Sequence, residues 1–108
     1  MGFDINVVVK DMAEAINNAV KHDCGDIQQY ATQILFNEKK SLEELGLARV
    51  SGEINDEVFN REIEREKKVV EAELLTIKIM TKALAQKAIN AALDVFTKAV
   101  KAAITIVP

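Results

Sequence analysis

The second half of the chain reads EINDEVFNREIEREKKVVEAELLTIKIMTKALAQKAINAALDVFTKAVKAAITIVP over residues 53–108. Between Gly52 and Pro108 this stretch contains neither glycine nor proline, the residues that most often end a helix. Its apolar residues recur at the three- and four-residue spacing of a helix face. These features predict one unbroken helix over residues 56–106, on the order of 75 Å long.

A turn immediately before the predicted helix is the clearest local signal in the sequence. Gly52 suits the left-handed conformation that follows a helix, and Asn55 is a favourable N-cap for the next one. Ile54 and Phe59 have the spacing of a hydrophobic staple, which fixes the angle at which the chain enters a helix. The segment LEELGLARVSGEINDEVF, residues 42–59, resembles the helical hairpins of SHOCT-type segments and of some gas-vesicle accessory proteins. Turn chemistry alone accounts for this resemblance, and no function follows from it.

The first half of the chain predicts two further helices, over residues 5–22 and 26–50. Apolar residues follow helical spacing in both segments. Asp4 is expected to cap the start of the first helix, and Gly25 to end it. Gly46 lies inside the second helix, where glycine costs roughly 1 kcal/mol relative to alanine, so we expect it to mark a close contact. The three segments together predict an all-α protein without a sheet.

The C-terminal part of the predicted long helix is apolar around most of its circumference, a pattern typical of a helix buried on several sides. Two shorter helices would leave part of it uncovered, so we expect a second copy to cover the rest. The predicted fold is a single domain over residues 1–108, a helical hairpin with one long C-terminal helix. It is expected to assemble into an antiparallel four-helix-bundle or coiled-coil-like oligomer, with a dimer favoured. The residues expected at the interface are Leu84, Ile89, Leu93, Phe96, Val100 and Ile104.

Two alternatives to this assembly stay open at the level of sequence. A bend near residues 86–90 would close the long helix into a monomeric four-helix bundle, although no helix-breaking residue stands there. The apolar, lysine-edged helix would also suit a membrane surface. Its polar face is narrow, however, whereas helices that lie on membranes carry a wide charged face. We therefore favour self-association over membrane binding.

The net charge of −3 and its distribution limit the classes of partner. Residues 1–52 carry 5 basic and 8 acidic groups, residues 53–73 carry 4 and 8, and residues 74–108 carry 5 and 1. A nucleic-acid-binding protein needs a surplus of lysine and arginine, so nucleic acid is not an expected partner. The sequence shows no signal peptide, no membrane-spanning stretch and a single cysteine. These features favour a cytoplasmic protein.

Three glutamates form the main candidate for a chemical site. Glu38 lies in the apolar stripe of the second predicted helix, and Glu62 and Glu66 lie on the stripe of the third, on which Glu73 also falls. Glu38 and Glu66 are equally far from the turn, so an antiparallel hairpin brings them level. Facing carboxylates in a helical core are how di-metal sites are built, which makes a ferritin-like metal site one hypothesis. Against it, the Glu-x-x-His motif is missing, and Arg65 and Lys68 are near enough to neutralise the acids.

The remaining candidate residues favour structural roles. His22, Asp23 and Cys24 are adjacent in a predicted turn, which favours an exposed loop thiol over a metal site. Tyr30 is expected in the core with its hydroxyl at the rim. No motif for nucleophilic catalysis or phosphate binding is present. The sequence thus predicts a non-enzymatic, cofactor-free assembly or interaction protein that binds its own copy or another helical protein. The alternatives are a metal-binding and a membrane-surface-binding helical protein.

Overall fold

The chain forms five helices and no strand over residues 3–106, the part that the computed structural model describes. The helices are α1 (Ile5–Cys24), α2 (Gln28–Asn37), α3 (Lys39–Val50), α4 (Asp56–Leu74) and α5 (Lys82–Ile106). The structure is 82% helical, which confirms the predicted all-α class.

The predicted helix caps are present. Asp4 caps α1, accepting a hydrogen bond from the Asn6 N–H at 3.0 Å, and Asn55 caps α4, accepting one from the Val58 N–H at 2.9 Å. Gly25 ends α1 at a φ of 73°, and Gly52 follows α3 at a φ of 83°. Both angles lie in the left-handed region that side chains disfavour, so glycine is needed at these two turns.

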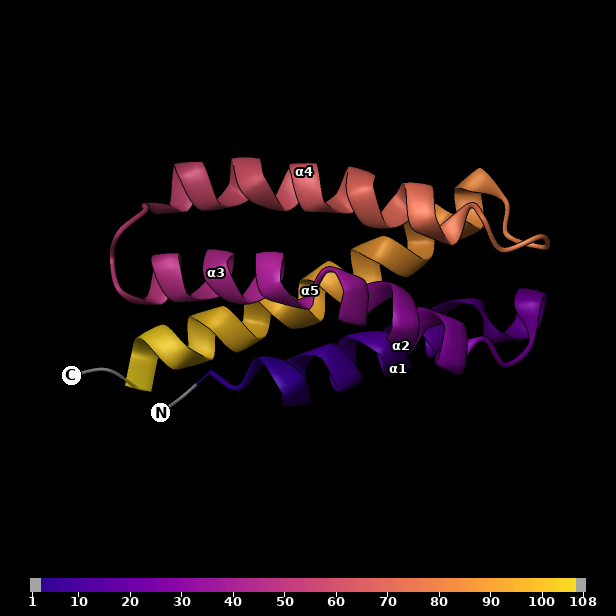
Figure 1. Cartoon of the computed structure of the whole chain (residues 1–108), viewed down its shortest axis with the longest axis horizontal. Helices are drawn as coiled ribbons and strands as arrows, with labels where there is room; N and C mark the ends of the chain where they lie inside the picture. Colours follow the sequence, from indigo (N-terminus) through magenta and orange to yellow (C-terminus); the bar gives the residue numbers. More distant parts are fainter. Residues whose placement is uncertain (1–2, 107–108) are drawn as a thin grey trace.

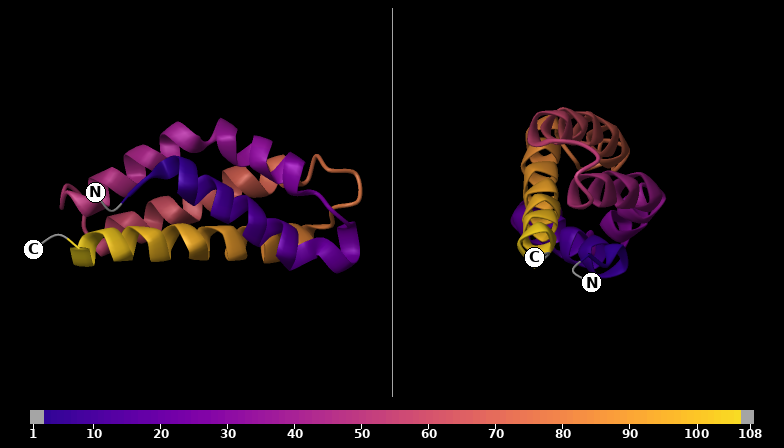
Figure 2. Two further views of the ribbon diagram at one scale, coloured as in Figure 1. Left: turned by 90° about the horizontal axis from the view of Figure 1, so that it is seen from below. Right: turned by 90° about the vertical axis from the view of Figure 1, so that its left-hand side faces the viewer.

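Along the long axis of the molecule, α1 and α4 run in one direction, and α2, α3 and α5 run in the opposite direction (Figure 1). α1 packs antiparallel against α5, and α4 packs against α5 near the start of that helix. α2 and α3 lie between α1 and α4, as the two further views in Figure 2 show. The molecule measures 44 × 22 × 19 Å, with a radius of gyration of 13.6 Å. A compact domain of this length is expected to have a radius of gyration of about 13 Å.

Phe96 lies at the centre of the core. Its side chain, on α5, is fully buried, and its ring stacks on that of Phe59 with centroids 6.1 Å apart. The ring of Phe3 meets it edge to face at 6.0 Å. Gly46 confirms the predicted close contact, because a Cβ atom there would lie 2.5 Å from Cζ of Phe3. The N-terminal, middle and C-terminal parts of the chain thus meet at the ring of Phe96.

The predicted unbroken helix over residues 56–106 is wrong. The chain leaves helical geometry after α4 and forms a loop over residues 75–81 before α5 begins. A helix of that length would measure on the order of 75 Å, whereas the longest dimension of the molecule is 44 Å. The alternative of a bend near residues 86–90 is also not seen, since α5 runs unbroken through them.

Two threonine hydroxyls explain how the helix stops without glycine or proline. Thr76 Oγ1 donates to the carbonyl oxygen of Glu73 at 2.6 Å, which satisfies one acceptor at the end of α4. Thr81 Oγ1 accepts from the Leu84 N–H at 3.2 Å, the contact of an N-cap at the start of α5. Neither contact requires a positive φ, so the usual signals for a helix end are missing from the sequence.

The predicted helix over residues 26–50 is also interrupted. It begins at Gln28 and divides at Glu38, and α2 and α3 meet there at an angle (Figure 2). The Glu38 N–H donates to the carbonyl oxygen of Leu35 at 3.0 Å, a tighter turn than that of an α-helix. Asn37 precedes this point, and asparagine is a poor residue for a helix interior.

Candidate functional site

The six predicted interface residues are mostly in the core of the chain. Ile89, Leu93, Phe96 and Val100 are at most 3% exposed, whereas Leu84 and Ile104 are partly buried. The chain's own helices therefore cover the surface that the sequence assigned to a partner. Self-association itself stays a prediction, but it needs a different surface.

The turn between α3 and α4 brings three carboxylates together, though not the three that the sequence suggested. Burial raises the pKa of Glu38, and the nearby charges of Glu66 and Glu73 raise it further. The predicted proximity of Glu38 and Glu66 is therefore confirmed. Glu62 is not among the charges that raise this pKa, and one of its oxygens lies 3.1 Å from Nη1 of Arg65. Glu73, which the sequence analysis did not include in the site, completes the group.

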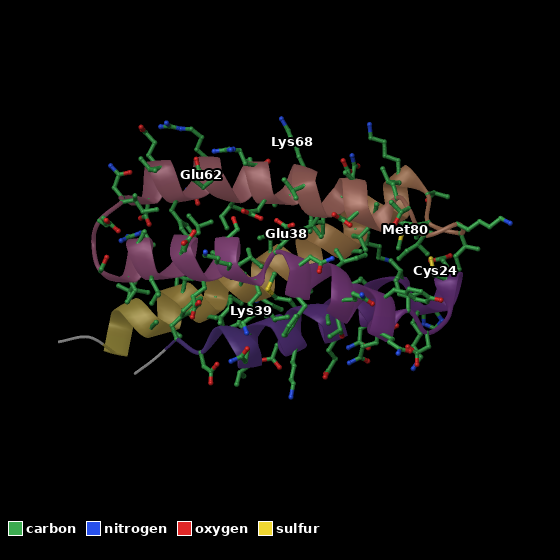
Figure 3. All side chains as sticks on the ribbon, in the orientation of Figure 1. Cys24, Glu38, Lys39, Glu62, Lys68 and Met80 are labelled. Atoms are coloured by element: carbon green, nitrogen blue, oxygen red, sulfur yellow. The ribbon has the colours of Figure 1, made fainter. Side chains whose placement is uncertain are left out.

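This carboxylate group has little local compensation. Ser41 Oγ donates to Oε1 of Glu66 at 2.6 Å, while Oε2 of Glu66 is buried without a hydrogen-bond partner. Lys68, an expected neutralising neighbour, points away from Glu38 on the outer side of α4 (Figure 3). Within residues 3–106 no ion pair joins Glu38, Glu66 or Glu73 to a basic side chain. The three acids thus repel one another, and the expected basic partner is missing.

A metal ion has no prepared site at these carboxylates. In the part of the chain that the structure describes, no group of three or more His, Cys, Asp or Glu side chains is arranged to hold one. The geometry therefore gives no support to the ferritin-like hypothesis. What the arrangement provides, among the described residues, is a group of carboxylates between α2, α3 and α4 without an ion-pair partner.

A hollow between α2 and the end of α4 adjoins this acidic group. We call it the α2–α4 groove, a cavity of about 220 Å³ lined by Tyr30, Gln33, Ile34, Asn37, Glu73, Thr76 and Ile77. A second, shallower hollow of about 420 Å³ continues from it and is lined by Val69, Ala72, Glu73 and Thr76. Glu73 and Thr76 line both, so a carboxylate stands where the two hollows meet, among polar and apolar side chains.

Tyr30 does not occupy the predicted place in the core. Its side chain is 63% exposed and forms one wall of the α2–α4 groove. Val69, which lines the second hollow, is 43% exposed. An exposed aromatic ring beside exposed aliphatic carbon is a common feature of protein-binding surfaces. The helical period alone could not show this, because Tyr30 fits the apolar stripe of its helix.

The turn between α1 and α2 is structural rather than chemical. The predicted exposed thiol of Cys24 is buried, and burial, followed by the charge of Asp23, raises its pKa. A raised pKa keeps the thiol protonated and less reactive. Asn17, which the sequence analysis did not single out, is buried and accepts a hydrogen bond from the Ile27 N–H at 2.8 Å. This contact fixes the turn to α1.

Comparison with protein-family models, with curated proteins and with solved structures gives no match for this chain. Among the described helices, none combines the length and the apolar character that crossing a bilayer requires. Function must therefore be argued from the surface of this chain alone.

Proposed function

We propose that the protein is a non-enzymatic helical interaction protein that associates with its own copy. The observation that carries the proposal is the distribution of exposed apolar side chains. Seven large hydrophobic residues are exposed within the described part of the chain, and five of them lie on α2 or in residues 69–79. These five are Tyr30, Phe36, Val69, Leu75 and Ile79.

Exposed apolar residues that stand singly are common on soluble proteins and need no explanation. Adjoining ones around a hollow are different, because they mark surfaces that another molecule covers. Tyr30 and Ile77 line the same groove, and Val69 lines its continuation. Burying such carbon contributes roughly 25 cal/mol for each Å² removed from water, which drives association. This surface replaces the one that the sequence assigned to the C-terminal helix.

The non-enzymatic part of the proposal rests on the sequence. The chain has one histidine and one cysteine, two residues apart, and the thiol is buried. An acyl- or group-transfer site needs a nucleophile within reach of a base and open to substrate. His22 is exposed at the end of α1, at a distance along the chain from the acidic group.

Light scattering across a wide range of protein concentration tests the proposal. We expect a mass that rises towards two chains as concentration increases. Val69→Ser, on the exposed apolar surface, should shift this rise to higher concentration. The matched control is Val7→Ser, because Val7 is 54% exposed on α1 and lies outside the groove. One chain mass at every concentration would contradict the proposal, and equal effects of both variants would place the interface elsewhere.

A further inference from the structure

We propose that the 75–81 loop of a second copy occupies the α2–α4 groove. The arrangement is two-fold, so that the loop of each copy lies in the groove of the other and Lys78 of each faces the carboxylate group of the other. This inference rests on the proposed self-association. It adds the surface through which the two copies associate, their relative orientation and the charged residues that join them.

The groove calls for a positively charged occupant. Glu73 lines it, and Glu38 lies near enough to Glu66 and Glu73 for both charges to act on its carboxylate. Four basic side chains close in sequence to these acids lie elsewhere: Arg65 pairs with Glu62, Lys67 pairs with Glu64 at 3.2 Å, Lys39 lies over the ring of Phe36 at 4.8 Å, and Lys68 points away from Glu38 (Figure 3). An ammonium group placed beside Glu73 would relieve repulsion that the single chain leaves in place.

The 75–81 loop presents the complementary chemistry. Leu75 is 42% exposed and Ile79 is 55% exposed, and the exposed Lys78 stands between them. Lys82 follows at the start of α5, and within residues 3–106 neither lysine takes part in an ion pair. The loop therefore offers apolar side chains to Tyr30, Ile34 and Ile77 of the groove and an ammonium group to the carboxylate of Glu73.

The loop is also held in a defined shape before it binds. The Ile77 N–H donates to the carbonyl oxygen of Leu74 at 3.0 Å, and the Met80 N–H donates to that of Ile77 at 2.9 Å. Met80 is buried, so it anchors the loop to the core while Ile79 points outward. A preformed loop loses less conformational freedom on binding, which favours association.

The position of the loop explains why a second copy is the fitting partner. Thr76 and Ile77 line the groove, so the loop and the groove adjoin at one end of the molecule. A two-fold axis beside them places each loop on the other groove and forms every contact twice. The opposite charges of the groove and the loop follow the distribution of charge in the sequence. Residues 53–73 carry 4 basic and 8 acidic groups, whereas residues 74–108 carry 5 basic and 1 acidic group.

Charge exchange between the two positions tests the inference. Glu73→Lys places two like charges at each contact of a homodimer, and so does Lys78→Glu. Each variant should raise the dimer dissociation constant by about tenfold or more, because opposed like charges disfavour an interface. An equimolar mixture of the two variants should form a heterodimer with an affinity near that of the wild type, because both contacts then join opposite charges. The matched control is Lys87→Glu, an exposed lysine of α5 that does not line the groove.

Sedimentation velocity with one variant labelled measures these outcomes, and circular dichroism checks that each variant keeps its helix content. A mixture that binds no more tightly than either variant alone would overturn the inference. Unchanged dimerisation in both single variants would also overturn it, while leaving the proposed self-association in place. A wild-type chain that stays monomeric at every concentration would overturn both.

Discussion

Phe96→Leu distinguishes a core residue from an interface residue. The phenylalanine ring makes two aromatic contacts, one with Phe59 at 6.1 Å and one with Phe3 at 6.0 Å. Each such pair contributes about 0.5–1.5 kcal/mol beyond the area that it buries. Leucine keeps most of the buried carbon but neither ring contact, so we expect the free energy of unfolding to fall by about 1–3 kcal/mol. For a domain of this size, each kcal/mol corresponds to roughly 4–8 °C in melting temperature.

Thermal and urea unfolding at two protein concentrations a hundredfold apart measure the effect. The difference between wild type and variant should be the same at both concentrations, because the lost contacts lie within one chain. Phe36→Leu is the matched control: this ring is 58% exposed, and its one recorded ring contact is with the ammonium group of Lys39 at 4.8 Å. The free energy of unfolding should fall by less than about 1 kcal/mol in Phe36→Leu. A Phe96→Leu effect that appears only at the higher concentration, with a loss of dimer, would refute a core position.

Three further substitutions test single features of the structure. At a concentration where light scattering returns one chain mass, Glu38→Gln should raise the free energy of unfolding at pH 7 by about 0.5–1 kcal/mol, since like-charge repulsion and burial of the carboxylate disappear. The folded-state pKa of Glu38 is raised, so its cost is absent below the unfolded pKa of about 4.3 and grows as pH rises through the folded value. The gain should therefore vanish in urea titrations below about pH 4, and Glu44→Gln, an exposed carboxylate of α3, should show no comparable gain at either pH. Asn55→Ala should lower stability by about 1 kcal/mol through loss of the α4 cap, and an unchanged melting curve would show that the cap contributes nothing. Thr81→Val should cost a similar amount, about 1 kcal/mol, at the start of α5, and a longer helix in hydrogen-exchange measurements would instead show that the hydroxyl causes the break.

The features that the sequence predicted correctly depend on neighbouring residues. The capping side chains of Asp4 and Asn55 act within a few residues, and Gly25 and Gly52 take backbone angles that other residues disfavour. The proximity of Glu38 and Glu66 was also predicted, because both residues are equally far along the chain from the turn and an antiparallel hairpin brings them level. Each of these predictions required only a helix end or a turn and the residues close to it in the sequence.

The features that the sequence did not predict depend on tertiary packing. Thr76 and Thr81 end a helix only where tertiary packing favours a reversal of the chain. The residue type alone does not indicate which threonine in the sequence acts in this way. Asn17 could be recognised as structural only once the Ile27 N–H was placed beside it. Glu73 lies two helical turns after Glu66 on α4, so the helical period places both on one face, but only the packing of α4 against α2 and α3 shows that Glu38 lies near both.

The break over residues 75–81 changes what the excess of apolar residues means. An unbroken helix would have held Phe96 about 60 Å from the start of α4, at about 1.5 Å per residue, and out of reach of Phe59 in the same chain. By turning back, the chain lays α5 against α1 and buries those residues within a molecule 44 Å long. The loop that permits this leaves Leu75 and Ile79 exposed beside Lys78. The exposed apolar residues are thus fewer than the sequence suggested. They lie where the chain reverses, next to the α2–α4 groove, whose Glu73 is opposite in charge to Lys78. The single chain itself covers Phe96 and the core residues around it, so the proposed association would join chains that are already folded.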